Sequence, residues 1–217
     1  MSTSISDHSG PVCHSSPVRY SINSTYWKHN YEISGPSPIY VENSKLLPGK
    51  PDLVFHDSTR QGSVMAKVKY RHVSANIKIG LINNSSGAVC WKSLSRVERG
   101  TFRYSFLHEL DHGRPEVFTW HAKHHLSFTQ GGSLELIHDR TGDIAAVYTK
   151  YSALYPPTSR NEGDGQVLEV KLDRGDDFLL IVLVTCLALY EQMRRRNNNA
   201  ASSAGASAGM GGVGSTI

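Results

Sequence analysis

The chain has 217 residues, of which 39% are hydrophobic, and its formal net charge is +4. This length is enough to bury one sizeable core, so we expect a single domain. The small excess of basic residues permits contact with anionic lipids but is too weak to predict nucleic-acid binding. The 3 cysteines are far apart and form no C-x-x-C pair, so they predict neither a disulfide framework nor a structural zinc site.

Residues 1–16 are polar and lack the apolar stretch of a secretory signal. We expect them to form a disordered leader. Together with the unpaired cysteines, this predicts a cytoplasmic protein, whose contact with membranes would be peripheral.

Between residues 18 and 172, short apolar or alternating runs are separated by turn sequences about every ten residues, a spacing typical of an all-β protein. The turns are rich in glycine, asparagine and aspartate, as in DRTGD at 139–143, and these residues suit antiparallel hairpins. We therefore predict about twelve strands, most of them joined as antiparallel hairpins.

The strongest candidate for a ligand-binding surface lies between residues 64 and 81, in VMAKVKYRHVSANIKIGL. Apolar and basic side chains alternate there, and successive side chains of a strand point to opposite faces. Four cations are therefore expected on the outward face of one hairpin: Lys67, Lys69, Arg71 and Lys78. They are candidates for binding an anionic head group. A simpler interpretation is that outward lysine and arginine keep the protein soluble and prevent strand pairing with other chains.

The segment HELDH matches the H-E-x-x-H pattern of zinc proteases. In that pattern His108 and His112 would bind zinc from one face of a helix, and Glu109 would act as general base. The residues before this segment alternate as in a strand, and a glycine and Pro115 follow it, so we expect the end of a hairpin. A zinc-dependent hydrolase is kept as an alternative function, while the leading expectation is a protein without enzymatic activity or cofactor.

Five large aromatic side chains are expected to point inward and fill the core: Trp91, Tyr104, Phe106, Trp120 and Tyr148.

The run FLLIVLVTCLALY at 178–190 is apolar on every side, with two aspartates before it and three arginines, at 194–196, after it. These charges suit the two ends of a helix, which we predict at about residues 176–196. Thirteen residues of helix are only about 20 Å long, whereas a bilayer core requires about twenty apolar residues. The run is thus too short to span a bilayer comfortably, and a tail-anchored membrane protein is kept only as a second alternative. A closed barrel of about eleven strands or more would cover such a helix completely.

An all-β chain that ends in a wholly apolar helix, preceded by EVFTWHAKHHLSFTQGGSLELIHDRTGDIAAVY, resembles the tubby C-terminal-like superfamily. This superfamily includes tubby domains, LURP-one-related proteins and phospholipid scramblases, and the chain is most similar to small fungal tubby-like proteins. The resemblance covers residues 17–196. It implies a twelve-stranded antiparallel barrel threaded by the C-terminal helix, and no established catalytic activity.

Tubby domains bind phosphoinositide head groups through basic residues on neighbouring strands. The resemblance therefore implies that the barrel domain at 17–196, expected to be monomeric, binds phosphoinositides or other anionic phospholipids. The residues we expect to bind them are the four cations indicated by the strand alternation, Lys67, Lys69, Arg71 and Lys78. Residues 197–217 are small and polar, and we expect them to form a disordered tail.

Overall fold

The computed structural model describes residues 16–25, 30–44, 50–71, 74–83, 86–109, 114–123, 132–150, 165–172 and 174–207. Almost all of the predicted leader and the last part of the predicted tail, residues 208–217, lie outside these ranges.

Twelve strands and one helix make up the regular structure of the described residues, and they confirm the predicted fold class. The strands are β1 (Val18–Ser24), β2 (Tyr31–Ser34), β3 (Ile39–Asn43), β4 (Leu53–Asp57), β5 (Val64–Tyr70), β6 (Ile77–Ile82), β7 (Val89–Arg96), β8 (Arg103–Glu109), β9 (Pro115–Ala122), β10 (Gly132–His138), β11 (Ile144–Lys150) and β12 (Gln166–Val170). Each strand pairs with its neighbours in the chain, and β1 pairs antiparallel with β12, which closes the barrel.

The alternation of side chains sets which face of each strand points into the barrel. In β12, for example, Gln166, Leu168 and Val170 are buried while the two residues between them are partly exposed. The turn between β10 and β11 uses Gly142, whose φ of 77° favours a residue without a Cβ. Local turn chemistry and strand alternation therefore agree with the closed sheet.

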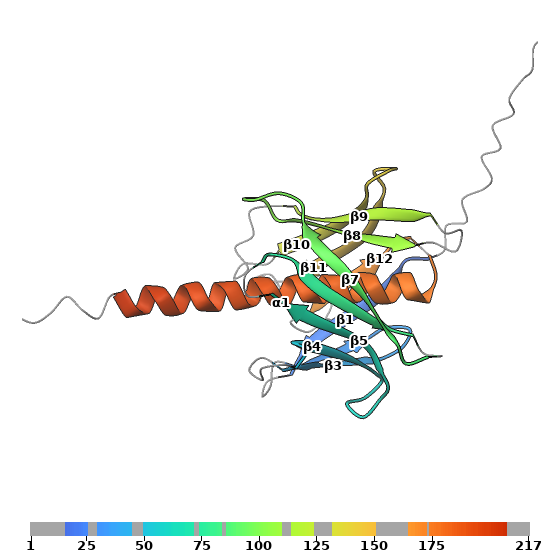
Figure 1. The fold of residues 1–217 in the computed structure, drawn as a ribbon, viewed down its shortest axis with the longest axis horizontal. Coiled ribbons are helices and arrows are strands. Elements are labelled where there is room, and N and C mark those ends of the chain that lie inside the picture. The colour runs from blue at the N-terminus through green and yellow to red at the C-terminus, as the bar shows by residue number, and fades with distance from the viewer. Residues whose placement is uncertain are drawn as a thin grey trace, which may run out of the picture.

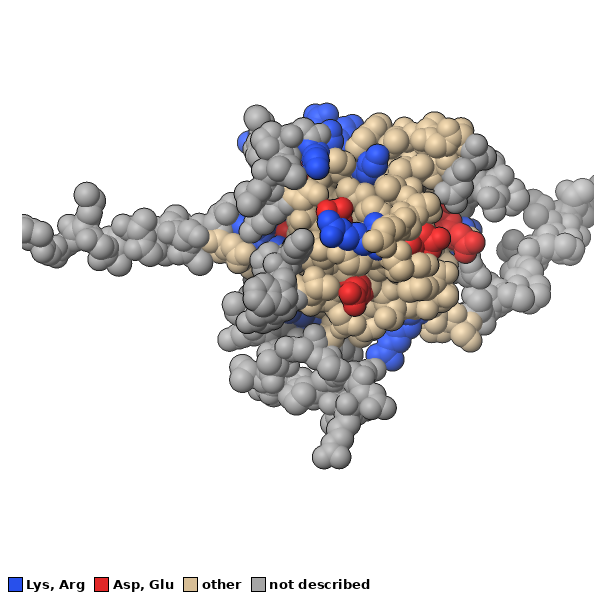
Figure 2. Space-filling model, turned by 90° about the horizontal axis from the view of Figure 1, so that it is seen from below, with Lys and Arg blue, Asp and Glu red and all other residues tan. Residues whose placement is uncertain are grey.

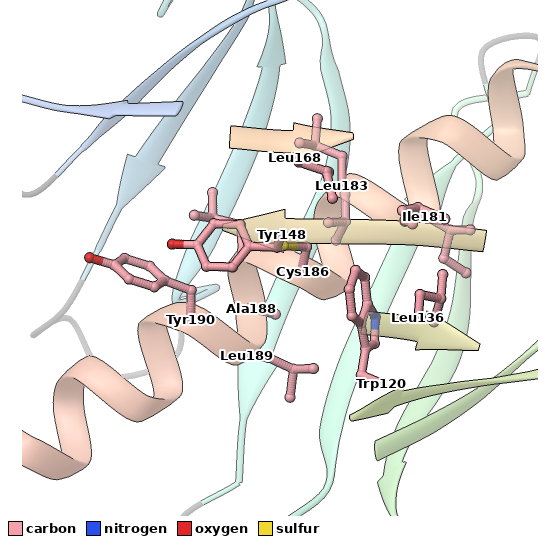
Figure 3. Close-up of a cluster of buried hydrophobic side chains, with 14 of the residues drawn as sticks. Trp120, Leu136, Tyr148, Leu168, Ile181, Leu183, Cys186, Ala188, Leu189 and Tyr190 are labelled. Atoms are coloured by element: carbon pink, nitrogen blue, oxygen red, sulfur yellow. The ribbon is translucent and has the colours of Figure 1, made fainter. Parts of the chain in front are cut away.

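Helix α1 (Asp176–Ser207) passes through the barrel, and its C-terminal part continues beyond the strands (Figure 1). Side chains from 181 to 191 are buried on every side of the helix. They pack against inward residues of the strands, as Figure 3 shows for Trp120, Leu136, Tyr148 and Leu168 around Ile181, Cys186 and Leu189. The barrel thus covers the helix, and the helix fills the barrel.

The helix ends later than predicted. It runs to Ser207 rather than to about residue 196, so the arginines at 194–196 lie within it and not at its C-terminus. Two of them form ion pairs with a buried carboxylate of the same helix: Arg194 Nε lies 2.6 Å from Glu191 Oε2, and Arg195 Nε lies 2.8 Å from Oε1. These arginines therefore stabilise the helix where it leaves the barrel.

Side chains of the barrel also bind the helix at the place where it leaves the barrel. Tyr31 donates its hydroxyl to Glu191 at 2.7 Å, and Arg195 binds the carboxylate of Asp52 at 2.7 Å. Tyr70 donates its hydroxyl to the carbonyl of Ala188 at 2.9 Å, and the guanidinium of Arg195 lies over its ring. The contacts connect β2, β5 and the residue before β4 to the helix.

No helix among the described residues is long and apolar enough to cross a membrane.

Candidate functional site

The register of β5 and β6 brings three of the four predicted cations together on the outer surface of the barrel. Lys69 lies directly opposite Lys78, and Lys67 lies opposite Gly80. Ala66 and Val68, the alternate residues of β5, are fully buried. We call Lys67, Lys69 and Lys78 the basic face. Arg71 is exposed just beyond the last pair of these strands, Tyr70 with Ile77, so the register does not place it opposite the other three.

Like charges that lie directly opposite one another on a sheet are destabilising. On the basic face, Lys78 donates from Nζ to Ser93 Oγ at 2.8 Å, and this neutral hydroxyl leaves the charge uncompensated. Among the described residues, no carboxylate forms an ion pair with any of the three lysines. A bound anion would relieve the repulsion between Lys69 and Lys78.

Charge is dispersed on one face of the barrel. On the side of the barrel shown in Figure 2, Lys and Arg side chains form separate small groups on a largely uncharged surface, with Asp and Glu among them. Among the described residues of this face no single large basic patch is seen, and the net charge of the chain is only +4, so a local group such as the basic face is the better candidate for attracting an anion.

Trp91 does not belong to the core, contrary to the prediction. It lies opposite Gly80 on the outer surface, and 45% of its area is exposed. The other four predicted core aromatics, Tyr104, Phe106, Trp120 and Tyr148, are buried. A Cβ added to Gly80 would lie 3.1 Å from the indole ring, so the glycine makes room for the ring to rest on β6. The glycine indicates that Trp91 points outward only once the pairing of β6 with β7 is known.

A cleft of about 560 Å³ lies between β7 and β8, next to the basic face. Its walls carry Trp91 and Ser93 from β7 and Leu107 and Glu109 from β8, together with Val117 from β9. Leu107 is 56% exposed, unusually so for a large apolar residue in a strand. No sequence pattern marks this cleft, because it depends on where the pairing of β7 and β8 stops.

The described part of the HELDH segment, His108 and Glu109, does not have the geometry that zinc catalysis requires. His108 and Glu109 lie in β8, where the histidine is buried, at 5% exposure, and the glutamate is exposed. Neighbouring residues of a strand point to opposite faces, so these two cannot act on one metal-bound water as they would from a helix. His112 lies outside the described residues. Within the described ranges, no group of three histidine, cysteine, aspartate or glutamate residues could hold a metal ion.

A second buried polar cluster lies near this strand and was also not predicted. His138 Nε2 is 3.2 Å from Glu116 Oε2, and Arg140 binds the other oxygen of Glu116 at 2.7 Å. The ring of His138 stacks on Phe118, and its Nδ1 contacts the hydroxyl of Thr141 at 2.8 Å. These contacts fix the turn between β10 and β11 against β9, which is a structural role.

In comparisons with known proteins, the chain matches no family model, no curated protein and no solved structure. The function of this chain is therefore inferred from its own residues and their geometry.

Proposed function

We propose that this chain is a non-enzymatic, tubby-like barrel that binds phosphoinositides or other anionic phospholipids at cytoplasmic membrane surfaces through its basic face. The observation that carries the proposal is the pair Lys69 and Lys78, which lie directly opposite one another without a carboxylate partner among the described residues. Lys67 adds a third cation to the same face, and Arg71 lies at its end.

The energetics support weak, reversible binding rather than permanent attachment. Each lysine or arginine near an anionic membrane contributes about 1 kcal/mol, so four of them suffice for salt-sensitive association. Surface attraction of this kind is screened as ionic strength rises. Two phosphates of a phosphoinositide head group would concentrate more negative charge between Lys69 and Lys78 than a single phosphodiester does.

Flotation on liposomes tests the proposal. We expect the purified protein to float with vesicles that contain phosphoinositides at low salt, and to remain at the bottom of the gradient at high salt or with neutral lipids. Replacing Lys67, Lys69, Arg71 and Lys78 with alanine should reduce flotation at least tenfold, which corresponds to the loss of about 1.4 kcal/mol or more.

The matched control removes the same charge elsewhere. Arg99, Arg114, Lys171 and Arg174 are all exposed and lie outside the basic face. Alanine at these four positions should leave most of the flotation intact. Equal losses in the two variants would show that only net charge matters, and no flotation of the unmodified protein with any anionic vesicle would refute the proposal.

A further inference from the structure

The two strands that border the cleft are paired over only a small part of their length. β7 has 8 residues and β8 has 7, but their register consists of Ser95 with Ser105 and Arg96 with Tyr104. On their other sides both strands are paired nearly throughout, β7 with β6 and β8 with β9. In Figure 1, β7 and β8 diverge from the end where they are paired. The barrel is thus closed at one end of this seam and open at the other.

Hydrogen-bond directions show which backbone groups face the opening. The N–H of Val97 donates to the carbonyl of Arg103 at 2.9 Å, so Val97 points toward β8. Two even-numbered residues point toward β6. The carbonyl of Ala88 accepts a hydrogen bond from the N–H of Asn83, and the N–H of Arg96 donates to the side chain of Asn76. Because these directions alternate along an antiparallel strand, the odd-numbered residues of β7 point toward β8.

Extending this register identifies the groups at the open end. If the pairing continued, Ser93 would lie opposite Leu107 and Trp91 opposite Glu109. Among the described residues these pairs do not form. The backbone N–H and C=O groups of all four residues therefore point into the cleft. Open strand edges are templates for pairing with another chain, and proteins usually protect them.

The side chains of the cleft define what kind of segment fits. Trp91, Leu107 and Val117 provide apolar contact on the outer surface. One cation, Lys92, and one anion, Glu109, also line the cleft, so a segment of either charge would meet a like charge. A partly apolar segment without charge is the best electrostatic match.

We propose that the cleft binds an extended, uncharged, partly apolar peptide segment of another protein, which adds as a strand to the open edges of β7 and β8. Recognition of this kind takes affinity from main-chain hydrogen bonds and specificity from alternate side chains. An acyl chain could cover the same apolar surface, but it has no donors or acceptors for the backbone groups of Ser93 and Leu107. This inference is independent of lipid binding by the basic face.

The probe is a set of capped, fluorescein-labelled peptides as long as β8, which has 7 residues. In one peptide valine alternates with threonine, and in two others it alternates with lysine or with glutamate. We expect the uncharged peptide to bind best, with a rise in fluorescence anisotropy and a change in the emission of Trp91. N-methylation of alternate backbone nitrogens along a pairing edge of the peptide should abolish the rise in anisotropy. It removes the backbone N–H donors of that edge while keeping the side chains.

A proline substitution makes the complementary test on the protein. Ser93→Pro removes an N–H that points into the cleft, and proline is tolerated at strand edges where the N–H has no partner in the sheet. Ser93→Ala is the matched control, since both variants lose the bond from Lys78 to the Ser93 hydroxyl. We expect proline to weaken binding of the uncharged peptide about tenfold or more, and alanine to leave it nearly unchanged. Circular dichroism would establish that both variants are folded.

Three results would overturn the proposal. The first is that none of the peptides binds the unmodified protein. The second is that the N-methylated peptide binds as well as the unmodified one, or that a fatty acid displaces the bound peptide. Displacement by a fatty acid would assign the cleft to lipid. The third is concentration-dependent dimerisation that Ser93→Pro abolishes, which would assign the open edges to a second copy of this chain. Because the readout is peptide anisotropy, failure here is distinct from failure of liposome flotation.

Discussion

At the scale of single residues, Glu191 shows how the fold places a charge inside a mostly apolar barrel. Its side chain is fully buried, yet its carboxylate accepts hydrogen bonds from Tyr31, Asn43, Arg194 and Arg195. Burial opposes ionisation, but the bonds from the two arginines and Tyr31 outweigh it and lower the pKa of Glu191 from 4.5 to about 2. The ionised carboxylate therefore stabilises the folded state.

The lowered pKa of Glu191 predicts how stability depends on pH. A carboxyl group with a lower pKa in the folded state stabilises the protein above its unfolded pKa of 4.5, and this contribution is lost as the pH falls to about 2. At neutral pH, Glu191→Gln should reduce the free energy of unfolding by about 3 kcal/mol, because it leaves Arg194 and Arg195 without their buried carboxylate. Urea unfolding of both proteins at several pH values should show this difference shrinking below the unfolded pKa.

The control for this experiment is Glu98→Gln, at an exposed position, which should have little effect at any pH. A constant difference between Glu191→Gln and the unmodified protein throughout the acid range would contradict the assignment, because it would show that the charge itself is not what stabilises the fold.

At the scale of secondary-structure elements, much of the fold follows from local sequence patterns. Alternating side chains in β5 and β6, and turn residues such as Gly142, predict the hairpins directly. The end of α1 was not predictable in this way. Arginines after an apolar run usually complement a helix C-terminus, but here Arg195 pairs with Asp52, more than a hundred residues earlier in the chain. A local pattern cannot contain a partner so distant.

The outward position of Trp91 and the cleft are not predictable from the sequence, for a related reason. Val89 to Leu94 reads as a largely apolar run, so it does not show which residues point outward. The outward direction of Trp91 follows only from its pairing with Gly80. The cleft depends further on the point at which β7 and β8 stop pairing, which no residue pattern in either strand marks. The basic face was predictable because it requires only the alternation within a single hairpin.

A hydrogen bond between two elements gives a further prediction. Trp120 of β9 donates its indole N–H to Thr185 of α1 at 3.0 Å, inside the barrel. Thr185→Val keeps the shape of the side chain but leaves the buried N–H without this acceptor, so it should destabilise the protein by about 1 to 3 kcal/mol. Thr185→Ser keeps the hydroxyl, so it should lower the free energy of unfolding by only about 0.8 kcal/mol, for the missing methyl group. Denaturant unfolding followed by tryptophan fluorescence measures both. A valine variant as stable as the unmodified protein would mean that this bond does not hold the helix to the sheet.

At the scale of the whole molecule, the barrel and the helix are parts of one core. Inward residues of the strands and the hydrophobic residues of α1 between 181 and 190 form a single buried cluster. A barrel of this size without its helix would have an unfilled interior, and the helix without the barrel would expose apolar residues on every side. Neither part is therefore expected to be stable alone, and unfolding should be a single cooperative transition.

A charge placed in the helix tests this dependence. Val184 is fully buried in the middle of the barrel, so Val184→Asp would introduce an unpaired carboxylate among apolar side chains and should prevent folding of the strands as well as the helix. Asn197→Asp introduces the same charge on an exposed part of the same helix, and it should leave the protein folded. Circular dichroism distinguishes the outcomes, because loss of helix signal alone would leave the strand signal of an empty barrel. A Val184→Asp protein that keeps a cooperative strand transition would show that the barrel folds without its helix, and the single-core description would then be wrong.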